Sequence, residues 1–389
     1  MQVQQTQLLG LALNQLRIDT ALPWSLYSEA GQLLLSRGFV LVRNAQIDSL
    51  IERGVYVRAE EFKLHNYPDV KHPPAPPEQS RIIDPFGLRE NISGRLALLL
   101  RDAAQDPALV PEFSTKIAEI AASVHTLCDG NVDATLAAIF LLNHTKYPIL
   151  HSIDTAVLVD LLARKMDWSE ARRRSAVCAA LTMNIAMIDA QTILALQRQP
   201  LTEVQKAGIA AHPATGIKQL RAAGVTDELW LRIVADHHEV PDGSGYPSGK
   251  KEVDPETLLV RTLDIFTALV TPRATRKALD PAQAARTLFV QENKYGNTLV
   301  GLLIKEIGLH PPGSYAKLKN GDIAVVSKRA SATSPPLVHS FINGKGLPML
   351  EPMWRDATKP EFAIVAALSR EEVTTKADLL KIWSAHTKA

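Results

Sequence analysis

The stretch from His237 to Pro247, His-His-Glu-Val-Pro-Asp-Gly-Ser-Gly-Tyr-Pro, constrains this chain more than any other. It places two adjacent imidazoles at the end of an apolar helical run and follows them with a glycine-rich turn. Neighbouring side chains on an α-helix diverge by about 100°, so His237 and His238 can face one cleft only where the helix stops. The stretch therefore predicts a helix end that presents two histidines to a ligand. The alternative is a chance histidine pair, favoured at a helix C-terminus by the helix dipole.

A helical domain is predicted around this stretch. Apolar residues recur with the 3.6-residue period of α-helices from residue 92 to about residue 310. Helix-breaking residues interrupt the pattern at Pro107, Pro148, Pro200, Pro213 and Gly224. Asp254 followed by Pro255 predicts a helix start, because Asp is a preferred N-cap and Pro suits the first helical position. The helix that begins there carries Asp264.

The region before the helical domain has a different character. Residues 1–61 alternate short apolar runs with turn residues, which predicts a small β-rich N-terminal domain with one helix near residues 45–52. Residues 62–91 include the proline-rich run from His72 to Pro77. Because proline cannot continue a helix or donate to a sheet, we expect an extended linker there.

The region after the helical domain returns to short strands. Residues 311–368 contain alternating apolar runs around an Asn320-Gly321 turn, and residues 369–389 predict a single amphipathic helix. The expected fold class is therefore mainly α. It comprises an all-helical domain at 92–310, a small β-rich N-terminal domain and a short β appendage.

Composition excludes several functional classes. A formal charge of +2 is too small to indicate a nucleic-acid polymer as partner. The longest apolar run, Val177–Ile188, is interrupted by Thr182 and Asn184 and is shorter than the ~20 residues that a membrane span needs. No membrane anchor is therefore expected. Cys128 and Cys178 lie in helical runs without metal-ligand spacing, which favours a reducing, cytoplasmic location and a place in the core.

The His237–Pro247 stretch resembles the signature of the HD-GYP family, bacterial metal-dependent phosphodiesterases that open cyclic di-GMP. The family's run is His-His-Glu-x-x-Asp-Gly-x-Gly-Tyr-Pro, and every fixed position is matched here. The resemblance implies the helical fold of the HD superfamily and a metal centre assembled from scattered helices. The metal ligands that it implies are His151, His212, His237, His238 and Asp264. Any one of them alone would more often be an ordinary residue, whereas five in the family's order and spacing favour a shared site.

The His-Asp pair for which the family is also named is missing. The family has His-Asp-Ile-Gly-Lys at the end of the second main helix, where this chain has the run Met183-Asn184-Ile185-Ala186-Met187. No shifted register restores the pair, since Asp189, the nearest carboxylate, has no histidine before it. The glutamate that some members carry four residues before the first histidine is Tyr147 here, which argues against a centre of three metals.

These replacements weaken the expected metal centre. Two divalent cations ~4 Å apart repel by roughly 17 kcal/mol at an effective dielectric constant of ~20, and in the family the motif aspartate bridges them. Asn184 has no charge to offer, Met183 is a soft ligand poorly suited to iron(II) or manganese, and Met187 lacks the family's ammonium group. We therefore expect at most one divalent transition metal, iron or manganese by the resemblance, or none. Its ligands would be His212 and the His237-His238 pair, since His151 and Asp264 have lost their partners.

The ligand-binding positions are better retained. Arg273 and Arg276 occupy the positions of the family's Arg-Pro-Tyr-Arg/Lys motif, with Ala274 and Thr275 between them. We expect the two arginines to lie on one face of a helical turn, where guanidinium groups capture a phosphate or a guanine edge. The alternative is a pair of exposed arginines at a helix end.

The Gly-Tyr-Pro turn supplies further ligand-binding candidates. These are Asp242, Gly245 and Tyr246. Tyr246 either stacks on a base or closes the turn, and the sequence does not decide between these roles. The turn is also a candidate docking site for a signalling protein partner.

Three functions fit these observations. The first is a cyclic di-GMP signalling protein that binds cyclic di-GMP or its linear product with weak or absent hydrolysis. The second is an active phosphodiesterase with a reduced metal site, so enzyme activity stays open. The third is a metal-free scaffold or adaptor, which the intact His212, His237 and His238 disfavour because a scaffold does not need three converging imidazoles. The sequence does not decide the oligomeric state.

Overall fold

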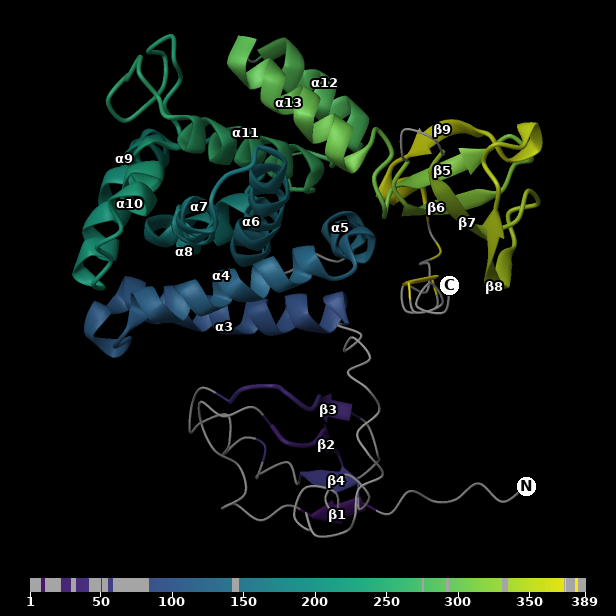
Figure 1. Ribbon diagram of the computed structural model, residues 1–389, viewed down its shortest axis with the longest axis horizontal. Helices are drawn as coiled ribbons and strands as arrows, with labels where there is room; N and C mark the ends of the chain where they lie inside the picture. The colour runs from purple at the N-terminus through teal and green to yellow at the C-terminus, as the bar shows by residue number, and fades with distance from the viewer. Residues whose placement is uncertain are drawn as a thin grey trace. The chain divides into compact units, whose positions relative to one another are not determined.

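The chain divides into two compact units, Met1–Arg81 and Ile82–Ala389. The computed structural model describes residues 8–10, 22–28, 33–41, 50, 55–58, 84–141, 147–274, 276–291, 294–330, 335–373, 375 and 382–383. The ribbon in Figure 1 labels the elements named below.

The first unit contains a small antiparallel sheet. Its strands are β1 (Leu8–Gly10), β2 (Leu26–Tyr27), β3 (Leu33–Leu35) and β4 (Tyr56–Arg58), in the order β1-β4-β2-β3. Trp24, Leu26, Leu41 and Val57 form its buried core. The prediction of a β-rich N-terminal region is confirmed. The helix expected near residues 45–52 falls outside the described residues except for Leu50.

The second unit is mainly helical. Its helices are α3 (Pro85–Gln105), α4 (Phe113–Asp129), α5 (Val132–Leu141), α6 (Tyr147–Lys165), α7 (Glu170–Thr182), α8 (Ile188–Leu196), α9 (Glu203–Ala222), α10 (Glu228–Asp236), α11 (Pro255–Val270), α12 (Pro281–Gln291) and α13 (Lys294–Ile307). Short 3-10 turns lie at η2 (Pro107–Leu109) and η3 (Ile185–Met187). The predicted helical fold class is confirmed.

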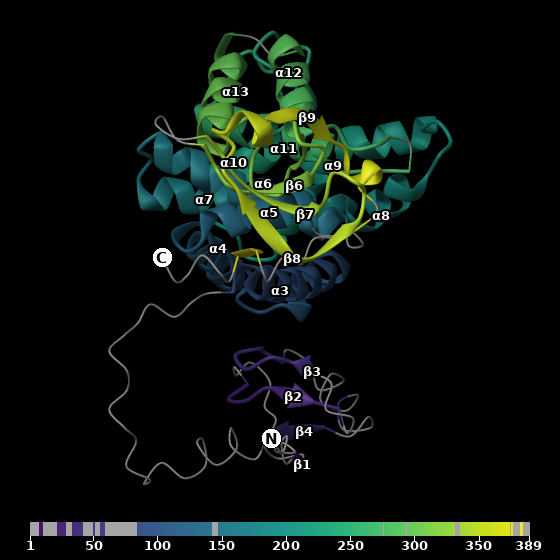
Figure 2. The same ribbon diagram turned by 90° about the vertical axis from the view of Figure 1, so that its right-hand side faces the viewer.

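Helix α6 is the centre of this unit. Every residue from Tyr147 to Ala163 is buried, as expected of a helix that is covered on all sides. Figures 1 and 2 show α3 and α4 as one layer, α6 and α7 as the next, then α11, with α12 and α13 outermost. Side chains of α6 that face α11 therefore project from a fully packed helix.

Helix α3 begins earlier than the expected start of the helical domain. Pro85 occupies the first turn, and the Asp84 carboxylate accepts a hydrogen bond from the Phe86 backbone N–H at 3.0 Å. An Asp-Pro pair is a strong helix start, so residues 85–91, assigned to the linker from sequence, are helical. Apart from Asp84, the rest of that expected linker lies outside the described residues.

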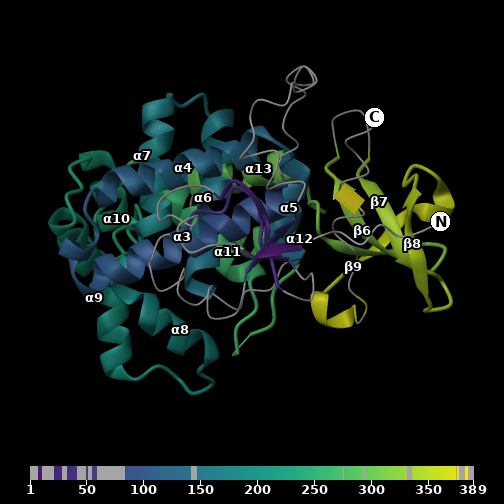
Figure 3. The same cartoon turned by 90° about the horizontal axis from the view of Figure 1, so that it is seen from below.

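A five-stranded antiparallel sheet follows the helices. Its strands are β5 (Tyr315–Leu318), β6 (Ile323–Lys328), β7 (Leu337–Ile342), β8 (Pro348–Arg355) and β9 (Ile364–Leu368), in the order β8-β7-β6-β5-β9. The expected Asn320-Gly321 turn joins β5 to β6, and Gly321 has the positive φ of +90° that glycine tolerates. Figure 3 shows the sheet at one end of the helical bundle. The predicted β appendage is confirmed.

The sheet packs on the helices through α5. Ala137 and Leu141 of α5 share a core with Val325 and Phe341 of the sheet. Of the helix expected at 369–389, the structure describes residues 369–373, 375 and 382–383, which include the 3-10 turn Arg370–Glu372. The remaining residues of that range lie outside the described residues.

Among the described residues, one helical stretch, Glu170–Leu196, is long and apolar enough to span a membrane. Half of its apolar window is buried inside the protein. Its first part is α7, which is a core helix. Cys128 and Cys178 are buried and free, and burial raises the pKa of the Cys178 thiol to about 12. Their predicted place in the core is confirmed, and the cytoplasmic location stays a prediction.

Candidate metal and ligand site

Three histidines converge where α9 and α10 meet. His212 lies in α9, His237 caps the C-terminus of α10, and His238 follows it. One nitrogen from each ring lies within 4.8 Å of the other two. The structure thus brings this predicted set together, and its role in metal binding stays a prediction.

Backbone carbonyls orient two of the rings. Nδ1 of His212 donates to the Ile209 carbonyl at 2.6 Å, and Nδ1 of His237 donates to the Val234 carbonyl at 2.8 Å. We assign the ring protons to Nδ1 on this basis, which leaves each Nε2 with a bare lone pair. The two Nε2 atoms lie 3.1 Å apart. Lone pairs that face each other at this distance repel unless a cation lies between them.

This geometry fits one metal ion. Two nitrogens bound to one ion at about 2.1 Å lie about 3.0 Å apart in octahedral and about 3.4 Å apart in tetrahedral coordination. The separation of 3.1 Å between His212 and His237 falls in that range. Bonds from Nδ1 to backbone carbonyls are also the contacts that orient metal-binding histidines.

Burial keeps these imidazoles neutral. Loss of hydration, aided by His237, lowers the pKa of His212 to about 4. The same two causes lower the pKa of His238 to about 2, and burial also lowers the pKa of His237. Neutral imidazole is the form that binds metals, so the protonation state of the cluster at neutral pH is the one that metal binding requires.

A buried glutamate closes the loop after α10. The carboxylate of Glu239 accepts hydrogen bonds from the backbone N–H groups of Ser248 at 2.7 Å and Lys250 at 2.9 Å. Tyr246 stacks on His238 inside this loop, with ring centroids 4.5 Å apart. The role of Glu239 in closing this loop was not predicted from the sequence. Its signal was an acidic residue four positions before the first glycine of the turn.

Gly245 is required by a close approach of the backbone. A Cβ atom at this position would lie 2.4 Å from the Val240 nitrogen and 2.6 Å from the His238 carbonyl oxygen. Asp242 is exposed and accepts a hydrogen bond from the Ser244 backbone N–H at 2.8 Å. Gly245 and Asp242 therefore shape the turn, and their predicted contacts with a ligand stay predictions.

The other predicted ligands pair with each other. His151, on α6, donates from Nε2 to the Asp264 carboxylate on α11 at 2.7 Å. Burial alone would raise the pKa of Asp264, but the His151 bond, with His238 and His237 nearby, holds it well below its usual range. These histidines act electrostatically on the Asp264 carboxyl group, so the His151–Asp264 pair lies near the histidine cluster.

Met183, Asn184 and Met187, which the resemblance predicts to replace the family's His, Asp and Lys, lie between the end of α7 and the end of η3. Met183 and Asn184 are buried, and Met187 is half-buried. The Met183 carbonyl faces Gly216, which lies one turn after His212 on α9. Met183 therefore lies close to the helix that carries His212.

Arg273 and Arg276 do not lie on a helical turn, so that expectation was wrong. Pro272 disfavours a helical conformation for the residue before it, and Thr271 is extended at φ −100° and ψ 130°. Helix α11 therefore ends at Val270. The two arginines instead exchange backbone hydrogen bonds of 2.9 and 3.1 Å.

The two guanidinium groups have different partners. Arg273 donates to the Tyr147 hydroxyl, and its guanidinium carbon lies 4.9 Å from the centroid of that ring. Arg276 donates to the Ala268 carbonyl. The arrangement allows one of them, the exposed Arg273, to reach a ligand.

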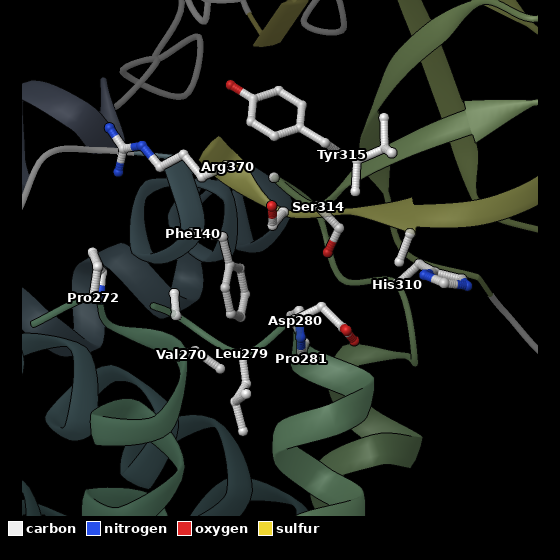
Figure 4. A pocket seen from close by; sticks show the side chains of 15 residues that line it. Phe140, Val270, Pro272, Leu279, Asp280, Pro281, His310, Ser314, Tyr315 and Arg370 are labelled. Carbon is white, nitrogen blue, oxygen red and sulfur yellow. The ribbon is translucent and has the colours of Figure 1, made fainter. Parts of the chain in front are cut away.

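A separate cavity lies where the helices meet the five-stranded sheet. Figure 4 shows Phe140 and Leu279 in its wall together with the polar side chains of Asp280, His310 and Ser314. The described residues that line it include none of the candidate metal ligands. It is therefore distinct from the histidine site.

Comparison with known proteins identifies a family and several relatives. The family model described as the HD domain matches residues 115–299. The cyclic di-GMP phosphodiesterase PA4108 of Pseudomonas aeruginosa is 25% identical over 252 residues, which cover 64% of this chain and 60% of that protein. The cyclic di-GMP phosphodiesterase PdeB of Borreliella burgdorferi is 23% identical, covering 51% of this chain and 54% of that protein. The 3'3'-cGAMP-specific phosphodiesterase 3 of Vibrio cholerae is 26% identical, covering 64% of this chain and 61% of that protein.

The helical fold and the histidine cluster define a protein of the HD-domain class. The matched His237–Pro247 stretch and these relatives support a member of the HD-GYP family. The chain spans 54–61% of the length of the curated relatives that it matches.

Proposed function

We propose that this chain is a cyclic dinucleotide signalling protein that binds cyclic di-GMP or its linear product and hydrolyses it weakly or not at all. The observation that carries the proposal is the unequal state of the two half-sites. His212, His237 and His238 are arranged for one metal ion, whereas His151 and Asp264 are bonded to each other.

The expected cofactor is one divalent transition metal, with iron or manganese favoured by the family resemblance. When bound, such an ion would supply Lewis acidity toward a phosphoryl oxygen. The chain itself supplies the three neutral imidazoles, the stacked Tyr246 and the guanidinium of Arg273. Asn184, at the place of the bridging aspartate, offers no negative charge to hold a second cation.

The exposed residues of the Gly-Tyr-Pro turn support a second part of the proposal. Asp242, Ser244 and Pro247 are exposed. The loop that carries them is fixed by the buried Glu239 carboxylate, which accepts two backbone hydrogen bonds. A rigid exposed turn beside a ligand site suits a signalling partner that senses occupancy. We therefore propose this turn as the contact for a signalling protein.

Calorimetry on the metal-loaded full chain tests the proposal. Hydrogen bonds to charged groups contribute about 1.5–3 kcal/mol each, so micromolar affinity for cyclic di-GMP is expected. Linear dinucleotide and 3'3'-cGAMP serve as competing ligands, and GMP is the control for the base alone. Absence of heat and of competition at millimolar ligand would contradict the proposal and favour the scaffold.

An active phosphodiesterase is the second candidate function. The relatives named as phosphodiesterases favour it. A hydrolysis assay on the same metal-loaded preparation separates the two. Turnover comparable to that of an intact family member would establish the enzyme and contradict the weak-hydrolysis proposal.

A further inference from the structure

Tyr147 joins the candidate metal centre to Arg273. Its ring stacks on the His151 ring, with centroids 5.5 Å apart and 19° between the planes. The same ring lies under the Arg273 guanidinium at 4.9 Å, and its hydroxyl accepts a hydrogen bond from that group. Since His151 in turn donates to Asp264, one chain of contacts runs from the metal centre to Arg273.

The two members of this contact differ in burial. Tyr147 is the first residue of the central helix α6 and is 6% exposed. Arg273 is an exposed residue of the turn after α11. The buried ring is therefore the fixed partner, and it determines where the long arginine side chain lies.

Tyr147 holds the guanidinium without cancelling its charge. The Tyr147 hydroxyl is a phenol, which is uncharged at neutral pH, so it accepts the hydrogen bond of Arg273 without adding a negative charge. A carboxylate at the same place would orient Arg273 equally well but would neutralise it. A guanidinium carries five N–H donors in a planar fork, enough to bind one phenol oxygen and the oxygens of a phosphate together.

Arg276 has a different place in the turn. Its side chain donates to the Ala268 carbonyl of α11, and its backbone is bonded to that of Arg273. The Ala274 backbone N–H donates to the Ala195 carbonyl at 2.9 Å, which ties the same turn to α8. These bonds fix the turn, so the role of Arg276 is to stabilise the conformation of the turn.

We propose that Tyr147 is a positioning residue that orients Arg273 toward the phosphodiester of the bound dinucleotide, while Arg276 only fixes the turn. The inference rests on the proposed function, since the phosphodiester is the anion that a cyclic dinucleotide brings. It assigns different roles to the two arginines that the sequence placed together, and it adds a residue that no ligand motif contains.

The test compares binding of two probes to the metal-loaded full chain. The probes are cyclic di-GMP and dimethyl phosphate, a phosphodiester anion without a base. Tyr147→Phe keeps the ring on His151 and removes the hydroxyl, and one lost hydrogen bond should weaken both probes about three- to tenfold. Arg273→Gln should weaken both about ten- to hundredfold. The double variant should bind no more weakly than Arg273→Gln alone, because the hydroxyl acts only through the arginine.

The controls separate positioning from a structural effect. Tyr315→Phe in the sheet and Arg232→Gln on the surface of α10 are the same chemical changes away from the site, and both should bind like the wild type. Metal content and guanosine binding should be unchanged in Tyr147→Phe. Should that variant fail to fold, Arg273→Lys at the exposed turn keeps the charge and loses the fork, and at least a threefold loss is expected.

Several results would overturn the inference. These are wild-type affinity in Tyr147→Phe or in Arg273→Lys, independent additive losses in the double variant, and binding of neither probe to the wild type. A different result would contradict the proposed function and leave the role of Tyr147 and Arg273 standing. In that case dimethyl phosphate binds in an Arg273-dependent manner while cyclic di-GMP does not bind.

Discussion

His151 of α6 and Asp264 of α11 are 113 residues apart in the chain, and their side chains meet in a hydrogen bond of 2.7 Å. The two helices are joined one turn further by Thr155 and Thr267, whose buried hydroxyls lie 2.8 Å apart. The carboxylate and imidazole are therefore held by packing and by each other. This pairing leaves His212, His237 and His238 as the candidate metal ligands.

The metal content should not exceed one ion per chain. Three neutral imidazoles serve one ion, whereas a second would have to break the His151–Asp264 bond. Elemental analysis after purification without chelator measures the ratio. His237→Ala should abolish binding, and His310→Ala, which lies in the separate cavity, should not. Two or more equivalents in the wild type would contradict the prediction.

Restoring the family's motif should restore the second ion and raise hydrolysis. Asn184→Asp supplies a bridging charge, Met183→His an imidazole, and Met187→Lys an ammonium group near the phosphate. Loss of a single electrostatic group costs about 10²–10³ in rate, so the triple variant should gain at least that much. Metal analysis and turnover of cyclic di-GMP are the measurements. Unchanged metal content and rate would show that the site is not shaped for two ions.

The metal-free protein should lose stability as the pH falls from about 6.5 to 4. The pKa of His212 is lowered to about 4 in the folded state, while in the unfolded chain it is near 6.5. Between these values the unfolded state binds more protons, so the free energy of unfolding decreases on acidification. Thermal unfolding at several pH values measures this. His212→Gln should flatten the dependence, and a slope unchanged by that substitution would contradict the assignment.

Gly245→Ala should destabilise the loop after α10. The added Cβ would lie 2.4 Å from the Val240 nitrogen, which is backbone and cannot move aside cheaply. Overpacking of this kind costs about 1–3 kcal/mol, and the displaced His238 should weaken metal binding. The control is Gly208→Ala on the exposed side of α9, where nothing lies within 4 Å and a gain of about 1 kcal/mol is expected. Equal melting temperatures for the two variants would refute the steric argument.

Asp154→Asn should strongly destabilise the helical unit. Asp154 of α6 forms a buried bidentate pair with Arg89 of α3, with bonds of 2.7 and 2.9 Å from Nη2. Removing one partner of a buried pair costs about 3–5 kcal/mol, because the other charge is left without compensation. Chemical denaturation measures the loss. Replacing both residues by apolar ones of similar volume should recover most of it, and no recovery would point to another cause.

Local order in this protein follows from the sequence. The 3.6-residue period predicts the helices, alternation and turn residues predict both sheets, and the Asp254-Pro255 pair predicts the start of α11. The Asp84-Pro85 pair that starts α3 was instead assigned to the linker. The end of α10 at the His237-His238 pair was predicted because adjacent helical side chains diverge. Each of these features depends on residues within a turn or two of one another, where backbone propensity and burial of one face decide the outcome.

Contacts between distant segments were decided only by the tertiary structure. Arg273 and Arg276 have helical spacing, but Pro272 ends the helix before them. The turn packs against α6, where the Arg273 guanidinium donates a hydrogen bond to the Tyr147 hydroxyl. The sequence placed His151 and Asp264 in one centre but did not show that they bond to each other. Hydrogen bonds between residues more than a hundred positions apart depend on how two helices pack, and that packing is a property of the whole core.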